Sequence, residues 1–298
     1  MTGRLSEITA RIDGIGQLGA VVNAMRRIAA ARVQEARGRL IAVDSYAATI
    51  ARAISEAVAL VPRTAATGPS PPARLAIVLF CAEQGFAGAF SERVLDSVGP
   101  DLATAELFLI GTRGNAVAAE RGMAAGWKCA FPAHSPGIPR LADRIAEALY
   151  PQIASGEIGR LDAVFGQREP GRGTEVQRRR LFPLDIGKFP LPINAVFPLI
   201  NLVPATLLRD LTTDYVFGQL CHAALHSFAA ENEARMESMA SARTQIERQL
   251  AILQANQRQV RQEEITAEII ELATGEIASR SRHKANYFPS LYRDAGAE

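Results

Sequence analysis

The chain of 298 residues carries a formal net charge of +2, with 48% hydrophobic and 21% charged residues. This balance is typical of a soluble globular protein and argues against a general nucleic-acid binder, which needs a marked excess of positive charge. The sequence contains no uninterrupted apolar stretch of the roughly 20 residues that span a bilayer, and its N-terminus lacks the apolar core of a secretory signal. We therefore expect a cytosolic or peripheral protein.

Residues 1–62 predict a long helix with one packed face. Apolar or small residues recur alternately three and four positions apart, which is the spacing of a coiled-coil seam. The seam residues are Leu5, Ile8, Ile12, Ile15, Gly19, Val22, Ala29, Val33, Ala36, Leu40, Val43, Ala47, Ile50 and Ile54. The spacing breaks once, beside Met25 and Arg26. We expect an N-terminal shaft helix that ends at Val61-Pro62.

Residues 63–203 predict a compact α/β domain, which follows a linker rich in proline, alanine, glycine and serine. Segments typical of strands and helices alternate, and this alternation favours βαβ units in a largely parallel sheet. The expected strands cover residues 75–80, 106–110, 127–131 and 161–165, with an added edge strand at 176–184. The expected helices lie near residues 91–98, 115–121 and 140–154.

A second shaft helix is expected over residues 204–280. Pro204 suits its first turn, because the N–H group that proline lacks has no helical partner there. Its seam is predicted at Met236, Met239, Ile246, Leu250, Leu253 and Val260, with interruptions at Arg243, Gln257 and Glu264. Polar seam positions lower the stability of a coiled coil, which favours contacts that can be made and broken.

The two shaft helices flank a compact domain, so they can pair with each other only by running antiparallel. The expected fold class is α/β: a long antiparallel two-helix coiled coil formed by the N- and C-terminal helices, plus a Rossmann-like central α/β domain. Residues 281–298 contain Pro289 and few apolar side chains, and we expect them to form a disordered tail.

Few residues suggest chemistry. Residues 109–114 lead from a strand through glycines into a helix and could cradle a phosphate, but the full Gly-x-Gly-x-x-Gly pattern is missing and a tight turn is favoured. His222 and His226 have the spacing of two metal ligands on one helix, yet without a second cluster a structural pair is favoured. Cys81 is interpreted as a buried thiol at a strand end. We expect no catalytic residue, metal or cofactor.

Four motifs occur in an order and spacing that match one family. The most specific covers residues 261–275, RQEEITAEIIELATG, which fits Ile-Thr-x-Glu, two residues, an acid, three residues and Gly. The others are Glu7-Ile8 with Ala24-Met25, the turn 84–90, and Tyr215 followed by Glu231, Arg235, Met236 and Met239. Over nearly its whole length the chain resembles the gamma subunit of F-type ATP synthases.

The resemblance implies a rotor without an active site of its own. In this family the paired helices penetrate the ring of catalytic alpha and beta subunits, while the α/β domain lies against the epsilon subunit and the membrane ring of c subunits. Rotation then couples ion flow through the c ring to ATP synthesis or hydrolysis. The implied location is peripheral, on the cytoplasmic face of a bacterial inner membrane, with no nucleic acid and no directly bound nucleotide.

The resemblance also assigns roles to residues. Arg261 and Gln262 fall on positions that hydrogen-bond a loop of a beta subunit, with Thr266 on the same helix face, and Met25 and Arg235 fall near the beta-subunit lever. Three acids fall on positions that stabilise the shaft or its contacts: Glu231, Glu268 and Glu271. The alternative for each is an ordinary solvated helix charge, which contributes little to stability.

Departures from the family pattern are typical of a divergent branch, such as the alternative F-type enzymes that pump Na⁺. Glu83-Gln84 replaces the family's Asp-Arg, and Glu276 follows Gly275 where alanine is usual. Two alternative functions stay open. An α/β enzyme with oligomerising helical arms would show activity or bind a cofactor when purified alone. A helical scaffold that binds nucleic acid would show a steep salt dependence of affinity.

Overall fold

The structure, a computed structural model, describes residues 2–60, 74–99, 101, 104–169, 171–185, 187, 189 and 199–287. The chain divides into two compact units. The larger unit comprises residues 24–240, and the smaller unit comprises residues 1–23 together with 241–298. Among the described residues, no helix combines the length and apolarity that crossing a bilayer requires.

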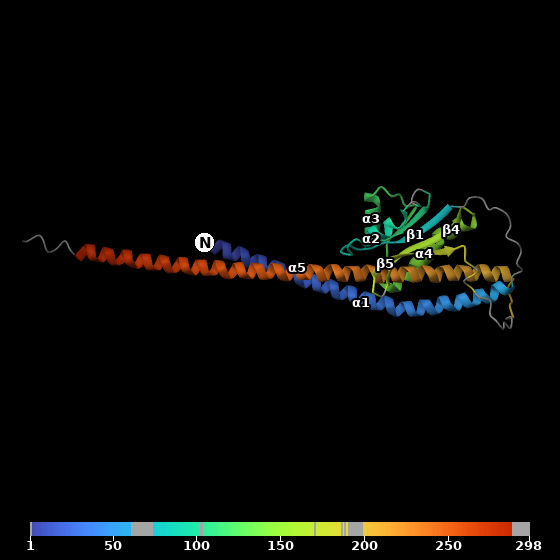
Figure 1. The fold of residues 1–298 in the computed structure, drawn as a ribbon, viewed down its shortest axis with the longest axis horizontal. Coiled ribbons are helices and arrows are strands. Elements are labelled where there is room, and N and C mark those ends of the chain that lie inside the picture. Colours follow the sequence, from blue (N-terminus) through green and yellow to red (C-terminus); the bar gives the residue numbers. More distant parts are fainter. Residues whose placement is uncertain are drawn as a thin grey trace, which may run out of the picture. The chain divides into compact units, whose positions relative to one another are not determined.

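The predicted shaft helices are present as α1 (Thr2–Leu60) and α5 (Pro204–Tyr287) (Figure 1). Every predicted seam residue of α1 is buried or half-buried, as the heptad spacing requires. The end of α5 differs from the expected boundary at residue 280. Residues 281–287 continue the helix, because the first proline after Pro204 in this region is Pro289. Residues 61–62 and 288–298 lie outside the described residues.

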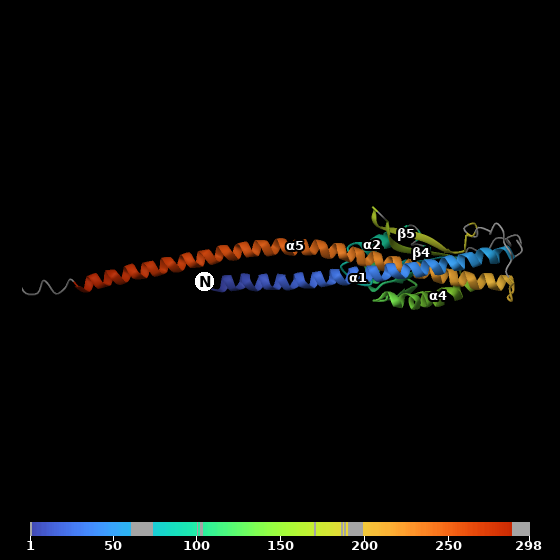
Figure 2. The same cartoon turned by 90° about the horizontal axis from the view of Figure 1, so that it is seen from below.

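Within each unit, α1 residues with higher numbers contact α5 residues with lower numbers, so the pairing is antiparallel as predicted. Figure 2 shows the two helices running side by side along the larger unit. In the larger unit Tyr46 packs edge-on against Phe217, with ring centroids 6.5 Å apart. In the smaller unit Gln257 Nε2 donates to Thr9 Oγ1 at 2.9 Å. Gly19 faces Ile246 there: an added Cβ would lie 3.4 Å from the Ile246 side chain, at van der Waals contact.

The α/β domain contains one five-stranded sheet in the order β3-β2-β1-β4-β5. Its strands are β1 (Arg74–Phe80), β2 (Glu106–Ile110), β3 (Trp127–Cys129), β4 (Ile158–Glu169) and β5 (Gly173–Phe182). The first four are parallel, and β5 pairs antiparallel with β4 as the predicted edge strand. The α/β class and the largely parallel sheet are therefore confirmed. The strand expected at 161–165 is longer than predicted, because β4 has a partner on each side.

The helices of this domain are α2 (Phe90–Asp96), α3 (Thr112–Glu120), the short 3-10 helix η2 (Ser135–Gly137) and α4 (Ile138–Ala154). Side chains alternate across β1, so Val78 and Phe80 face one core while Ile77 and Leu79 face the other. The second core is closed by α2 and α3, and the first by α4 together with α5. The start of α5 thus belongs to the larger unit.

Candidate functional site

A buried ion pair on α5 holds the turn that follows β1. Glu231 and Arg235, one helical turn apart, are only 3% and 5% exposed, and they form a charge-assisted hydrogen bond. The Glu231 carboxylate also accepts from the backbone N–H groups of Glu83 and Gln84, at 3.1 and 3.4 Å. The Arg235 guanidinium donates to the carbonyl oxygens of Gln84 and Gly85, both at 3.2 Å. We call Glu231 and Arg235 the turn clamp.

The turn is also tied to the rest of the sheet by Glu83. Its carboxylate accepts from the Thr112 N–H at 2.9 Å, the Thr112 hydroxyl at 2.7 Å and the Phe131 N–H at 2.7 Å. One side chain therefore joins the ends of β1, β2 and β3. Sequence reasoning did not foresee this role of Glu83, because its partners become neighbours only when the parallel strands align.

A cavity of about 320 Å³ lies beside this turn, lined by Met25, Ile28, Ala29, Arg32, Gln84, Gly85, Phe86, Asn232 and Arg235. Phe86 has a φ of 63° and is 65% exposed. A bulky residue in the left-handed region is a strained arrangement that tends to occur at functional sites. Met25 is half-buried at the same cavity. The structure therefore brings Met25 and Arg235 to one cavity and adds Phe86, which the sequence did not single out.

The predicted partner contact of Arg235 stays a prediction, but its guanidinium faces inward. A second group of ion pairs lies nearby, around Glu233, whose side chain is 8% exposed. Its Oε1 lies 2.6 Å from Nη2 of Arg37 on α1 and 3.4 Å from Nη1 of Arg168 on β4. Since Glu233 lies on α5, this group connects α1, α5 and the sheet.

The other predicted residues lie in the smaller unit, later in the sequence than the turn clamp. Arg261, Gln262, Thr266, Glu268 and Glu271 are all exposed on α5. The Thr266 hydroxyl donates to the Gln262 carbonyl at 2.8 Å, a bond within the helix that leaves the outer face free.

Apolar side chains are exposed beside them. Ile265, Ile269 and Leu272 are 50%, 61% and 70% exposed. Their spacing of four and three positions places them on one helix face, and Arg261 and Gln262 lie one turn before Ile265 on that side. We call Ile265, Ile269 and Leu272 the apolar stripe. Arg4, near the start of α1, pairs with Glu263 of α5 at 3.9 Å, directly before this stripe.

The glycine turn that suggested a phosphate cradle is filled by the protein itself. The N–H groups at the start of α3 donate to Glu83 and to the carbonyl of Ala82. A Cβ on Gly114 would lie 2.1 Å from Cys81 Cβ, so the glycine is required for this close approach. Burial raises the pKa of the Cys81 thiol, which disfavours the reactive thiolate.

His222 and His226 form a contacting pair. Their Nε2 atoms are 3.2 Å apart, and Arg179 Nη1 lies 3.3 Å from His222 Nδ1. Within the described part of the chain, no group of three or more His, Cys, Asp or Glu side chains could hold a metal. Burial, and then the neighbouring His226, lower the pKa of His222 to about 3; burial also lowers the pKa of His226, against the opposing effect of Asp44.

We expect the free energy of unfolding to fall as the pH drops below about 6.5, where a histidine of the unfolded chain gains its proton. The folded chain resists protonation down to about pH 3 at His222. His222→Gln should reduce this loss between pH 7 and pH 5, measured by urea denaturation at each pH. His134→Gln, at an exposed histidine, is the matched control. If the free energy of unfolding falls equally with pH in both variants and in the parent, His222 is not the source of the pH dependence.

Comparison with known proteins shows the family of this chain. The family model described as ATP synthase matches residues 4–278. An ATP synthase gamma chain of Frankia casuarinae is 30% identical over 292 residues, covering 92% of this chain and 97% of the relative. One from a Parafrankia species is 28% identical over 291 residues, with the same two coverages.

Solved structures agree at the level of the fold. A chain of the Euglena gracilis mitochondrial ATP synthase, in a structure of OSCP, F1 and c-ring, superposes with a TM-score of 0.62 at 11% identity, covering all of both chains. A chain from the central stalk and c-ring of the Tetrahymena thermophila mitochondrial ATP synthase gives a TM-score of 0.54 at 15% identity, covering 74% of this chain and 99% of that chain.

Proposed function

This chain belongs to the family of ATP synthase gamma chains, the central-stalk rotor subunits of F-type ATP synthases, and we propose that its rotation couples ion flow to ATP synthesis or hydrolysis. The family match over residues 4–278 carries this proposal. The ions pass through a membrane c ring, and the chemistry takes place at the alpha and beta subunits. The chain itself acts as a non-catalytic subunit.

The exposed end of α5 supports a contact with the alpha and beta subunits. An apolar stripe with Arg261 and Gln262 one turn before it combines a hydrophobic surface with hydrogen-bond donors, which is the composition of a protein interface. Arg261, Gln262 and Thr266 hydrogen-bond a beta subunit in this proposal. Glu268 and Glu271 stabilise that contact from the neighbouring exposed positions.

The turn clamp supports the transmission of torque. A rotor must pass force between its α/β domain and its shaft helices, so the connection within the larger unit has to be rigid. Glu231 and Arg235 bond the backbone of the turn, and Glu233 joins α1 and β4 to α5. Met25 and Phe86, at the cavity beside the turn, are the side chains that we assign to contact with the beta-subunit lever.

The same proposal assigns the remaining partners. The α/β domain faces the epsilon subunit and the c ring, and the complex is peripheral on the cytoplasmic face of a bacterial inner membrane. Different contacts of the turning shaft with each catalytic subunit then bias three equivalent sites among conformations, since a partner shifts an equilibrium only by its differential affinity.

A co-purification experiment tests the function. The tagged full chain, co-expressed with the alpha and beta subunits of its own source, is expected to capture both subunits in a complex that hydrolyses ATP, while the chain alone shows no hydrolysis. An α/β enzyme would be active or bind a cofactor alone. Capture of neither subunit under conditions where both are folded would reject the rotor.

A further inference from the structure

The first turns of α1 pack loosely against α5. Between Gly3 and Val21 no described side chain of α1 is buried, and its seam residues there are half-buried. In the larger unit the same seam is closed, since Ala29, Val33 and Ala36 are 1%, 4% and 0% exposed. A helix depends mainly on the burial of its apolar face for stability in a protein. The start of α1 therefore gains less from packing than the rest of the helix.

The polar contacts between the two helices of the smaller unit are exposed. The side chains of Gln257 and Thr9 share a hydrogen bond of 2.9 Å at the surface. Arg4 Nη1 and Glu263 Oε2 are 3.9 Å apart, and these side chains are 73% and 54% exposed. Exposed pairs of this kind add little to stability, because water competes for both partners.

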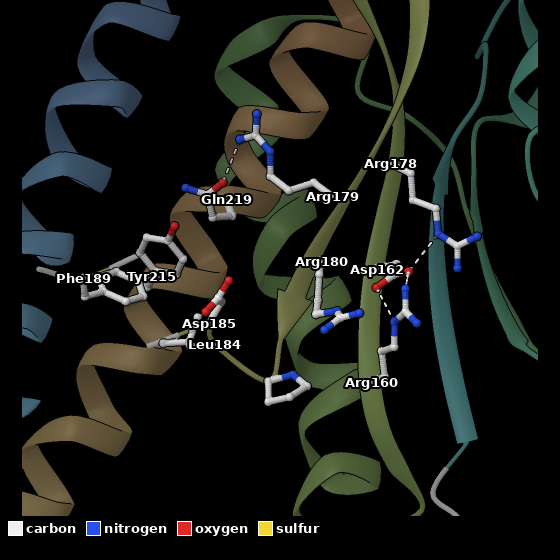
Figure 3. A pocket seen from close by; sticks show the side chains of 11 residues that line it. Arg160, Asp162, Arg178, Arg179, Arg180, Leu184, Asp185, Phe189, Tyr215 and Gln219 are labelled. Carbon is white, nitrogen blue, oxygen red and sulfur yellow. Dashed lines mark hydrogen bonds and ion pairs between the residues drawn. The ribbon is translucent and has the colours of Figure 1, made fainter. Parts of the chain in front are cut away.

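Polar contacts in the larger unit are enclosed by comparison. Figure 3 shows Asp162 of β4, with 1% of its side chain exposed, paired with Arg160 at 2.7 Å and with Arg178 at 2.8 Å. On the opposite face of β5, Arg179 donates to Gln219 of α5 at 2.9 Å. These bonds tie the sheet together and fix α5 to it, so weak polar contacts are not a general property of the chain.

A groove of about 450 Å³ lies between the two helices of the smaller unit. Its lining residues are Leu5, Ser6, Thr9, Ala10 and Asp13 on α1 and Glu264 on α5. The Oε1 atom of Glu264 is buried and, among the described residues, has no hydrogen-bond partner. A carboxylate oxygen that is shielded from water without a partner disfavours the state that buries it. Glu264 therefore favours separation of the helices, which returns this oxygen to water.

Glycine weakens the same segment directly. Gly14 and Gly16 are exposed on α1, and a Cβ added to either would meet nothing within 4 Å. Packing therefore does not require glycine at these positions. Each glycine in a helix interior lowers the helix equilibrium about fivefold relative to alanine, so the two together lower it about twentyfold.

We infer that residues 2–20 of α1 form a strap, a segment that opens from α5 by local unfolding while the larger unit stays folded. The half-buried seam, the unpaired oxygen of Glu264 and the two glycines all favour the open state. Segments with few buried contacts open at a much lower free energy than the whole protein unfolds. The strap differs from an ordinary frayed helix end, because Gly14 and Gly16 lie in its interior.

Opening changes the surface of the smaller unit. Ile246 on α5 is 7% exposed, and a Cβ on Gly19 would touch its side chain, so the strap covers Ile246 in the closed state. The closed state is a pair of helices, and the open state is α5 with an uncovered apolar seam. In the rotor function proposed above, on which this last step alone rests, the catalytic subunits favour whichever state they bind more tightly.

Hydrogen–deuterium exchange of the full chain, under conditions where exchange follows the opening equilibrium, tests the strap. Corrected for intrinsic rates, amides of residues 12–20 should exchange about a hundredfold or more faster than those of residues 29–54. Gly14→Ala with Gly16→Ala should slow exchange in the strap about twentyfold. Gly38→Ala is the matched control, because Gly38 is also exposed on α1, with open space around an added Cβ, but lies in the larger unit.

Fast exchange of residues 12–20 that the double variant slows and Gly38→Ala leaves unchanged supports the strap. Fast exchange confined to residues 2–6 is ordinary fraying and overturns the inference. It is also overturned if the double variant has no effect, or if both variants affect the strap equally, because opening then does not depend on helix stability in this segment. The chain is measured alone, so failure to capture the alpha and beta subunits would reject the rotor without altering this result.

Discussion

Glu231→Ala is expected to lower the free energy of unfolding of the larger unit by about 3 kcal/mol or more, the typical effect of breaking a buried ion pair from one side. The change leaves Arg235 as an uncompensated charge that is 5% exposed, and it removes the acceptor of two backbone N–H groups of the turn. Urea denaturation of the full chain, followed by fluorescence of its single tryptophan, Trp127 on β3, measures the loss.

Two further variants separate the ion pair from a general effect of mutation. Glu237→Ala, at an exposed position of the same helix, should change the free energy of unfolding by no more than about 0.5 kcal/mol. The double variant Glu231→Leu with Arg235→Met should be more stable than Glu231→Ala, because no unpaired charge remains. If Glu231→Ala behaves like Glu237→Ala, the turn clamp has no energetic role.

Charging the apolar stripe should weaken assembly by about a hundredfold or more. In Ile265→Asp with Ile269→Asp, two side chains that are 50% and 61% exposed in the isolated chain become acidic. If the partners bury them, each isoleucine contributes about 1.5 kcal/mol or more, and about 3 kcal/mol corresponds to a factor above 100 in dissociation constant. The measurement is the affinity of the full chain for the alpha and beta subunits, by biolayer interferometry.

The control for this effect is Ile41→Asp. Ile41 is 74% exposed on α1 in the larger unit, so it undergoes the same chemical change away from the stripe. We expect its affinity to stay within about threefold of the parent chain. Circular dichroism must show equal helix content in the double variant, since aspartate also lowers helix propensity. An affinity equal to that of Ile41→Asp would exclude the stripe from the interface.

The elements of this fold were predictable because they depend on local periodicity. The heptad spacing from Leu5 to Ile54 predicted which face of α1 is buried, and the alternation of apolar segments predicted a parallel sheet with an antiparallel edge. The last turns of α5 were missed, because a polar sequence without proline remains compatible with helix.

The connections between elements could not be predicted in the same way. In sequence, Glu231 and Arg235 look like an exposed pair one turn apart, which contributes little to stability. They are buried only because a turn some 150 positions earlier in the chain lies over them. The cavity at Phe86 likewise depends on how this turn meets α1 and α5 in space. The assigned partner contacts came from the family resemblance and stay predictions.

The place of α5 in the core has a consequence for synthesis on the ribosome. The last strand, β5, ends at Phe182, but the sheet face that carries Val78 and Phe80 is covered by α5 side chains such as Leu220 and Phe228. A nascent chain with all five strands would therefore expose an apolar surface until about fifty further residues had emerged, a few seconds or more at usual elongation rates. During that interval the chain is a natural client for chaperones that bind exposed apolar segments.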